Sequence, residues 1–281
     1  MLMSKRRMLV SKIVTYVVLI VISIFCVFPF LWMLVTSLKP TDQIRSTHPS
    51  FFIKHPTFSH FQNVLVNTKF ITFFMNSFIV AISTTLISIL VSIFAGYALS
   101  RFQRFRGVKF LNITMLLSQM IPGVLLLVPL YILMQRFGLL DTYASMILAY
   151  TTFMVPLCTF MLKGFFDSIP YELEEAAEMD GCSRVRIIFQ IILPISIPSI
   201  VATALFAFVN AWNEFMFGYV FINDEAHRTL TPGITLFKGL YSTDWGSIMS
   251  ASVLAVIPIV IMFIYLQRYL IEGMTAGSVK G

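Results

Sequence analysis

Long runs of residues without a charged side chain alternate with short charged segments along this chain. Six such runs cover residues 13–38, 70–100, 110–135, 142–162, 187–213 and 245–267. A helix needs roughly 20 apolar residues to cross the hydrocarbon core of a bilayer, so each run is long enough to span it. The pattern predicts an all-α integral membrane protein with six transmembrane helices.

The composition agrees with a membrane protein. Hydrophobic residues make up 58% of the chain and charged residues only 12%, about half the charged share of soluble domains. That is too few charges to form the exterior of a soluble protein. The three cysteines and the histidines of the first connection show no spacing typical of a disulfide framework or a metal site. We therefore expect neither.

Basic residues indicate the orientation. Thirteen of the 20 Lys and Arg residues fall in the N-terminus, the second and fourth connections and the C-terminus. Cytoplasmic segments carry the excess of Lys and Arg, so both termini are expected in the cytoplasm. The expected organisation is a cytoplasmic N-terminus (1–12), a first span (13–38), an extracytoplasmic loop (39–69), a core of five spans (70–271) and a cytoplasmic tail (272–281). The net charge of +7 then reflects topology and indicates no nucleic acid partner.

Catalytic and nucleotide-binding motifs do not occur in the sequence. Without a Gly-Lys dipeptide there is no Walker A loop, and HExxH, GxSxG and GxGxxG patterns are missing as well. We expect no enzyme activity and no cofactor on this chain, so any energy must enter from another polypeptide.

The fourth connection, about residues 163–194, predicts a short amphipathic helix. Pro170 suits its first position, and the acidic residues after it complement the positive end of the helix dipole. Gly181 permits a sharp stop, and Ser183 can cap a second helix that enters the fifth span. Residues at i, i+3, i+4 and i+7 spacing share one face of this helix: Leu173, Ala176, Ala177 and Asp180. This face is narrow and weakly apolar, which suits docking on another protein. Periodicity alone also allows a helix that lies against the bilayer.

This segment resembles the EAA motif of ABC importer permeases. Glu175-Ala176-Ala177 is followed after three residues by Gly181, and after nine more by Ile191-x-Leu193-Pro194. Residues 28–32, 37–40, 212–215 and 273–281 also resemble the carbohydrate-uptake branch of that family, in particular the six-span second permease of maltose-type systems.

The resemblance implies a type I ABC importer permease fold in a bacterial-type cell membrane. The implied partners are a second, different permease, a dimeric ABC ATPase that binds ATP and Mg, and an extracytoplasmic solute-binding protein. The implied substrate is a sugar, in the first place an oligosaccharide, moved by alternating access. Another polyol-like solute, such as glycerol phosphate, is the alternative within the family.

Residue roles also follow from the resemblance. ATPase coupling is expected at Leu173, Glu175, Ala176, Ala177, Asp180, Gly181, Ile191, Leu193 and Pro194. Contact of the tail with the ATPase is expected at Thr275, Ala276 and Gly277.

Glu214 is the one acidic residue embedded in a predicted span. A charge near the bilayer centre costs at least ~2.5–3.5 kcal/mol on insertion scales, so a cavity or a partner should receive it. Asn210, Trp212 and Asn213 lie beside Glu214 and offer amide groups and an aromatic face to a sugar. We predict that these four residues line a substrate path. A hydrogen bond to another subunit, or a position near the outer interface, is the alternative.

Prolines inside the spans can kink their helices. We predict hinges at Pro122 with Gly123, where two helix breakers are adjacent, and at Pro156. The alternative is that these are ordinary prolines of membrane helices.

Two other function classes fit the sequence less well. A secondary transporter needs ionisable residues along an ion path within the membrane, and Glu214 alone offers itself. A membrane-bound enzyme needs catalytic groups gathered at one membrane face, and no such constellation occurs.

Overall fold

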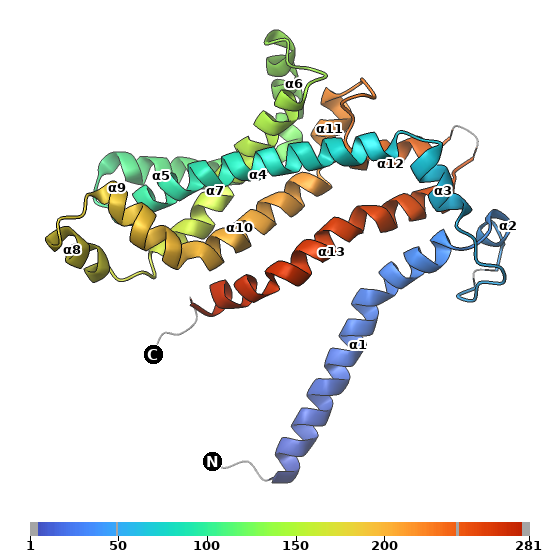
Figure 1. Ribbon diagram of the computed structural model, residues 1–281, viewed down its shortest axis with the longest axis horizontal. Helices are drawn as coiled ribbons and strands as arrows, with labels where there is room; N and C mark the ends of the chain where they lie inside the picture. Colours follow the sequence, from blue (N-terminus) through green and yellow to red (C-terminus); the bar gives the residue numbers. More distant parts are fainter. Residues whose placement is uncertain (1–4, 49, 240–241, 277–281) are drawn as a thin grey trace. The chain divides into compact units, whose positions relative to one another are not determined.

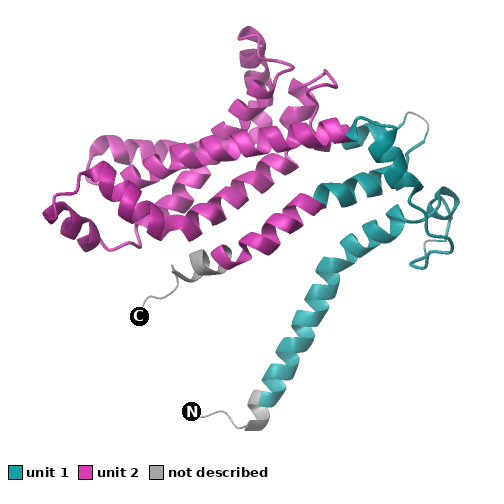
Figure 2. Ribbon diagram, in the orientation of Figure 1, with its two compact units in different colours: residues 1–70, 234–256 teal, residues 71–233, 257–281 magenta. Residues whose placement is uncertain are grey.

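The computed structural model describes residues 5–48, 50–239 and 242–276, with side chains for 9–48, 50–239 and 242–269. In these ranges the elements are helical, apart from a single β-bridge between Lys238 and Thr243. The chain divides into two compact units, residues 1–70 with 234–256 and residues 71–233 with 257–281 (Figure 2).

The described helices include the apolar spans that the charge-free runs predict. Five are long and apolar enough to cross a membrane: Leu9–Ser37, Phe70–Arg101, Tyr143–Phe166, Arg184–Asn213 and Trp245–Tyr269. A further pair, Arg106–Gln119 and Gly123–Arg136, is bent by 95° at a short break. Counted as one span, this pair completes the six, and the all-α class is confirmed.

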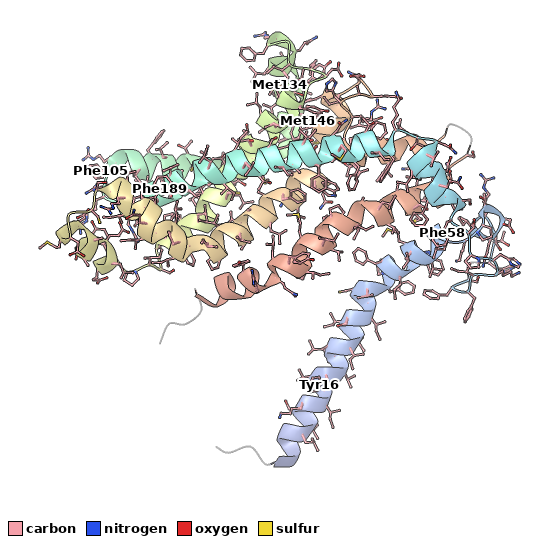
Figure 3. The ribbon with its side chains drawn as sticks, viewed as in Figure 1. Tyr16, Phe58, Phe105, Met134, Met146 and Phe189 are labelled. Atoms are coloured by element: carbon pink, nitrogen blue, oxygen red, sulfur yellow. The ribbon has the colours of Figure 1, made fainter. Side chains whose placement is uncertain are left out.

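The first unit joins the first span to the start of the last. Its elements are α1 (Lys5–Ser37), α2 (Thr41–Ile44), α3 (Ser59–Val66), η3 (Thr235–Phe237) and the first part of α13 (Trp245–Ala276). Most side chains of α1 are exposed, as Tyr16 illustrates in Figure 3. By contrast, α3 packs tightly on α13: a β-carbon on Gly246 would lie 2.2 Å from Cε1 of His60. Only glycine fits there.

Lys39 holds the loop that follows α1. Its ammonium group donates to the carbonyl oxygen of Ser50 and lies 4.8 Å from the centroid of the Trp32 ring. His60 Nε2 is 3.0 Å from the carbonyl oxygen of Lys39. Burial lowers the pKa of Lys39, because desolvation disfavours its charged form.

The second unit contains the remaining spans, whose helices are labelled in Figure 1. Its elements are α4 (Phe70–Arg101), α5 (Arg106–Gln119), η1 (Gly123–Leu126), α6 (Leu127–Arg136), α7 (Tyr143–Phe166), α8 (Glu172–Met179), α9 (Arg184–Ile187), η2 (Ile188–Ile192), α10 (Leu193–Asn213), α11 (Met216–Phe221), α12 (Leu230–Ile234) and the rest of α13. Helices α4 and α7 approach closely at Gly96, where a β-carbon would lie 3.2 Å from the carbonyl oxygen of Thr159. Small residues allow such approach in membrane proteins.

Prolines act differently from span to span. Pro122 lies at the break, after the end of α5 at Gln119 and before the 3₁₀ turn η1. Pro156 lies inside α7, which continues to Phe166, so the predicted hinge there corresponds to no break. Pro194 follows the π-helical turn η2. Proline has no N–H and its ring collides with the carbonyl group four residues back, so the regular α-helical hydrogen bonding is interrupted before it.

Candidate functional site

The segment that resembles the EAA motif forms α8 and the turn after it. The carbonyl oxygen of Tyr171 accepts the backbone N–H groups of Glu174 (2.9 Å) and Glu175 (3.1 Å). The helix therefore begins at Glu172. The sequence predicts a start at Pro170, two residues earlier. Acidic side chains occupy its first turn, where they complement the helix dipole.

Gly181 ends α8 in a Schellman motif. The N–H of Gly181 donates to the carbonyl oxygen of Glu178, and the N–H of Cys182 to that of Ala177, each at 3.0 Å. Gly181 has φ +80°, the left-handed conformation that its place at a helix end predicts. Ser183 then caps α9, where its hydroxyl accepts the N–H of Arg186.

The side chains of α8 divide into a buried and an exposed set. Glu174 and Ala177 are buried, whereas Leu173 and Met179 are exposed, Met179 to 88%. This corrects the face expected from the sequence, because Ala177 faces its own chain and does not share the exposed side with Leu173. The exposed side of α8, so named from here on, consists of Leu173, Glu175, Ala176, Met179 and Asp180.

Ala177 belongs to a hydrophobic cluster built from several helices. The other buried members are Tyr97, Leu162, Phe166, Ile169, Ile187 and Ile192. Ile191 is partly buried against the cluster, Leu193 is half-buried and Pro194 is exposed. The second half of the EAA-like pattern therefore packs largely against this chain.

Glu174 is bound from α4 through both of its carboxylate oxygens. Arg101 Nε lies 2.6 Å from Oε1, and the hydroxyl of Tyr97 donates to Oε2 at 2.6 Å. The sequence did not predict this contact of Tyr97 and Arg101 with Glu174. One signal could have suggested Glu174: it lies three residues before Ala177, on the same side of the helix.

A pocket of about 160 Å³ brings together residues of two other sequence predictions. It includes Gly123 from the predicted hinge, and Asn210 and Glu214 from the predicted path. Its lining is completed by Tyr150, Phe153, Met154, Ala211 and Phe217. The pocket is thus mainly apolar and aromatic, with a few polar groups, as small-molecule sites commonly are.

Glu214 lies at a break between helices and not inside one. Helix α10 ends at Asn213, and Glu214 has extended backbone angles. Its carboxylate accepts the N–H groups of Phe217 (2.9 Å) and Gly218 (3.2 Å), at the start of α11. The charge therefore has two backbone donors within its own chain, in addition to lining the pocket.

Trp212 and Asn213 do not line this pocket. Trp212 is buried in an aromatic core, with ring centroids 5.3 Å from Phe74 and 5.1 Å from Phe78. Asn213 is exposed. Of the four residues predicted to line the path, Asn210 and Glu214 line this pocket.

Two of the remaining predicted residues, Thr275 and Ala276, lie at the end of α13. The helix therefore continues past the last charge-free run, which ends at 267. Gly277 lies outside the described residues. Within the described part of the chain, no three His, Cys, Asp or Glu side chains come together to hold a metal ion.

Comparison with known families and proteins gives consistent matches. The family model for binding-protein-dependent transport system inner membrane components matches residues 88–276. The trehalose/maltose transport system permease protein of Thermococcus litoralis is 36% identical, over 98% of this chain and 99% of that protein. The sulfoquinovosyl glycerol transport system permease protein of Agrobacterium fabrum is 37% identical, over 90% of this chain and 89% of that protein. A diacetylchitobiose uptake system permease protein of Streptomyces coelicolor is 34% identical, over 98% of this chain and 100% of that protein.

A solved structure has the same fold. It belongs to a bacterial ABC transporter involved in the import of the acidic polysaccharide alginate, and it superposes with a TM-score of 0.81. The match covers 96% of this chain and 99% of that chain at 19% identity. The ABC importer permease fold that the resemblance implies is confirmed.

Proposed function

Since this chain belongs to the family of binding-protein-dependent transport system inner membrane components, we propose that it is the permease subunit of an ATP-driven sugar importer. It is a transporter subunit and not an enzyme. The names of its relatives include trehalose/maltose, diacetylchitobiose and sulfoquinovosyl glycerol. The substrate class that these names support is an oligosaccharide or a related sugar conjugate.

The arrangement of α8 supports this function best. Its inner residues, Glu174 and Ala177, are buried in its own chain, which leaves the exposed side of α8 free for another protein. Family membership implies an ATPase and a solute-binding protein as partners. In our proposal the exposed side of α8 docks on an ATPase subunit that binds ATP and Mg.

The pocket beside Glu214 is our proposed part of the translocation path. Asn210 and Glu214 supply polar groups and Phe153 an aromatic ring, which suit the hydroxyl groups and the rings of a sugar. A second, different permease would supply the other wall. The break at Pro122 and Gly123 adjoins the pocket through Gly123, so bending there would open or close it during alternating access.

The end of α13 is a further proposed contact with the ATPase. Thr275 and Ala276 lie in the last turn of α13, beyond the apolar span Trp245–Tyr269. Both termini are placed in the cytoplasm by this proposal. Deleting 276–281 should then reduce sugar-stimulated ATP hydrolysis, and unchanged hydrolysis would argue against the contact.

Reconstitution tests the substrate class. The purified complex of this chain, its second permease and its ATPase would be placed in vesicles and supplied with its binding protein. Labelled maltose, trehalose, diacetylchitobiose and sulfoquinovosyl glycerol would be offered with and without ATP. We expect ATP-dependent uptake of at least one of them. Uptake that needs an ion gradient and no ATP would contradict the proposal.

A further inference from the structure

Three side chains at the junction of α4 and α8 form what we call the latch: Tyr97, Arg101 and Glu174. The carboxylate of Glu174 has a charged donor on one oxygen and a hydroxyl donor on the other, each at 2.6 Å. The Arg101 and Glu174 side chains are only 9% and 5% exposed. Arg101 also donates through Nη2 to the carbonyl oxygen of Ile169 (3.1 Å), in the segment that leads into α8.

The last turn of α4 also binds the end of α7. The hydroxyl of Ser100 donates to Oδ1 of Asp167 at 2.6 Å, and Lys163 contacts the other carboxylate oxygen at 2.5 Å. The final turn of α4 therefore holds both the residue that follows α7 and the first turn of α8. By comparison, the pair between α8 and α9, Glu178 with Arg184, is exposed and separated by 3.6 Å. Such exposed pairs contribute little.

Helix α4 is suited to carry a movement from one of its ends to the other. It runs from Phe70 to Arg101, and it is the one span among the described residues without an internal or adjoining proline. Sharp kinks occur mostly at prolines, so α4 should move as a unit. At its other end Phe74 and Phe78 pack on Trp212, two residues before Glu214.

Buried ion pairs of this kind are not simply stabilising. The cost of desolvation can match the attraction, so apolar residues of similar volume are often tolerated in place of both partners. A buried pair does, however, demand one geometry of its donors and acceptors. The geometry of the latch therefore fixes the position of α8 relative to α4. Packing of the small Ala177 side chain alone would fix that position less strictly.

We propose that Tyr97, Arg101 and Glu174 are positioning residues, which make α4 follow α8 and so transmit the movement of the ATPase to the pocket beside Glu214. This inference rests on the proposed docking of α8 on an ATPase. The latch takes no part in docking itself, because its side chains are buried. It converts the displacement of a short helix into the displacement of a whole span.

The test is the number of sugar molecules transported per ATP hydrolysed by the reconstituted complex. The double variant Arg101→Met with Glu174→Leu replaces the ion pair with apolar side chains and leaves no buried charge. We expect normal assembly and ATPase binding, with a fall in sugar transported per ATP of about tenfold, a typical scale for coupling between sites. If sugar transported per ATP stays at the wild-type value, the inference is wrong, and the pair only stabilises the fold.

Two further variants keep the test decisive. Tyr97→Phe retains the ion pair and removes one hydrogen bond, so it should fold and still transport less sugar per ATP than wild type. Should it couple as wild type does, the proposal fails even if the double variant does not assemble. Arg104→Met is the matched control, because Arg104 is exposed three residues after Arg101, and it should change nothing. A wild-type complex without ATP-dependent sugar uptake would instead contradict the proposed function.

Discussion

Gly181 sets the direction in which the chain leaves α8. A β-carbon added there would meet no atom within 4 Å, so space does not require glycine. The requirement comes from φ +80°, a conformation that costs most L-residues roughly 1–2 kcal/mol.

Gly181→Val should therefore weaken the Schellman motif and change the aim of α8. We expect normal membrane insertion, because no spanning residue changes, with reduced ATPase binding and reduced sugar uptake. Gly181→Asn is the matched control, since asparagine tolerates positive φ, and it should stay near wild type. ATPase copurification and uptake measure both effects. Equal behaviour of the two variants would show that backbone conformation at this position does not matter.

Neighbouring alanines of α8 should respond differently to the same substitution. Ala177→Trp overpacks the cluster with Leu162 and Phe166, which should lower the free energy of unfolding of the subunit by ~1–3 kcal/mol. Ala176→Trp places the ring on the exposed side of α8, so the subunit should be as stable as wild type but bind the ATPase weakly. Thermal unfolding of the purified subunit and ATPase copurification separate the two. Full ATPase binding by Ala176→Trp would rule out docking on this side.

At the scale of elements, the break between α10 and α11 shapes the pocket. Glu214 accepts two N–H groups at the start of α11, and its carbonyl oxygen accepts the hydroxyl of Thr231. The carboxylate therefore holds the turn that carries Phe217 into the pocket lining.

Replacing Glu214 should thus affect both stability and transport. Glu214→Ala removes both acceptors and should destabilise the turn by about 1 kcal/mol, as the loss of a helix cap does. Glu214→Gln keeps one acceptor, so it should assemble normally while sugar uptake changes. Asn213→Ala, exposed and outside the pocket, is the control. Thermal unfolding and uptake are the measurements. If Glu214→Gln fails to assemble, the residue is structural and not part of the path.

At the scale of the whole molecule, the orientation in the membrane stays a prediction from the distribution of basic residues. Basic residues favour the cytoplasmic side for the second and fourth connections. Ser59, Gln103 and Asn223 are exposed residues of the first, second and fifth connections. They therefore report on both sides of the membrane.

Single cysteines at these positions test the orientation. Cys26 and Cys182 would first be replaced by serine, whereas Cys158 is fully buried and stays. An impermeant thiol reagent applied to intact spheroplasts should label Ser59→Cys and Asn223→Cys. It should label Gln103→Cys only after permeabilisation. Labelling of Gln103→Cys in intact spheroplasts would reverse the orientation.

The sequence by itself determined the membrane class, the number of spans, the family resemblance and the residues that end α8 and cap the next helix. These features depend on local composition and spacing. A helix that spans lipid must be long and largely free of charge, and Gly181 and Ser183 act on the backbone next to them. The break at Pro122 was likewise visible as two adjacent helix breakers.

Tertiary structure alone decided which side of α8 is buried and what binds Glu174. Periodicity grouped Ala177 with Leu173, yet packing against Leu162 and Phe166 turned Ala177 inward. Arg101 and Glu174 are 73 positions apart, and no local pattern records such a contact. The same holds for Trp212, which packs on Phe74 and Phe78 of α4. Contacts between distant segments depend on how the helices pack together, and that geometry is set by the whole chain.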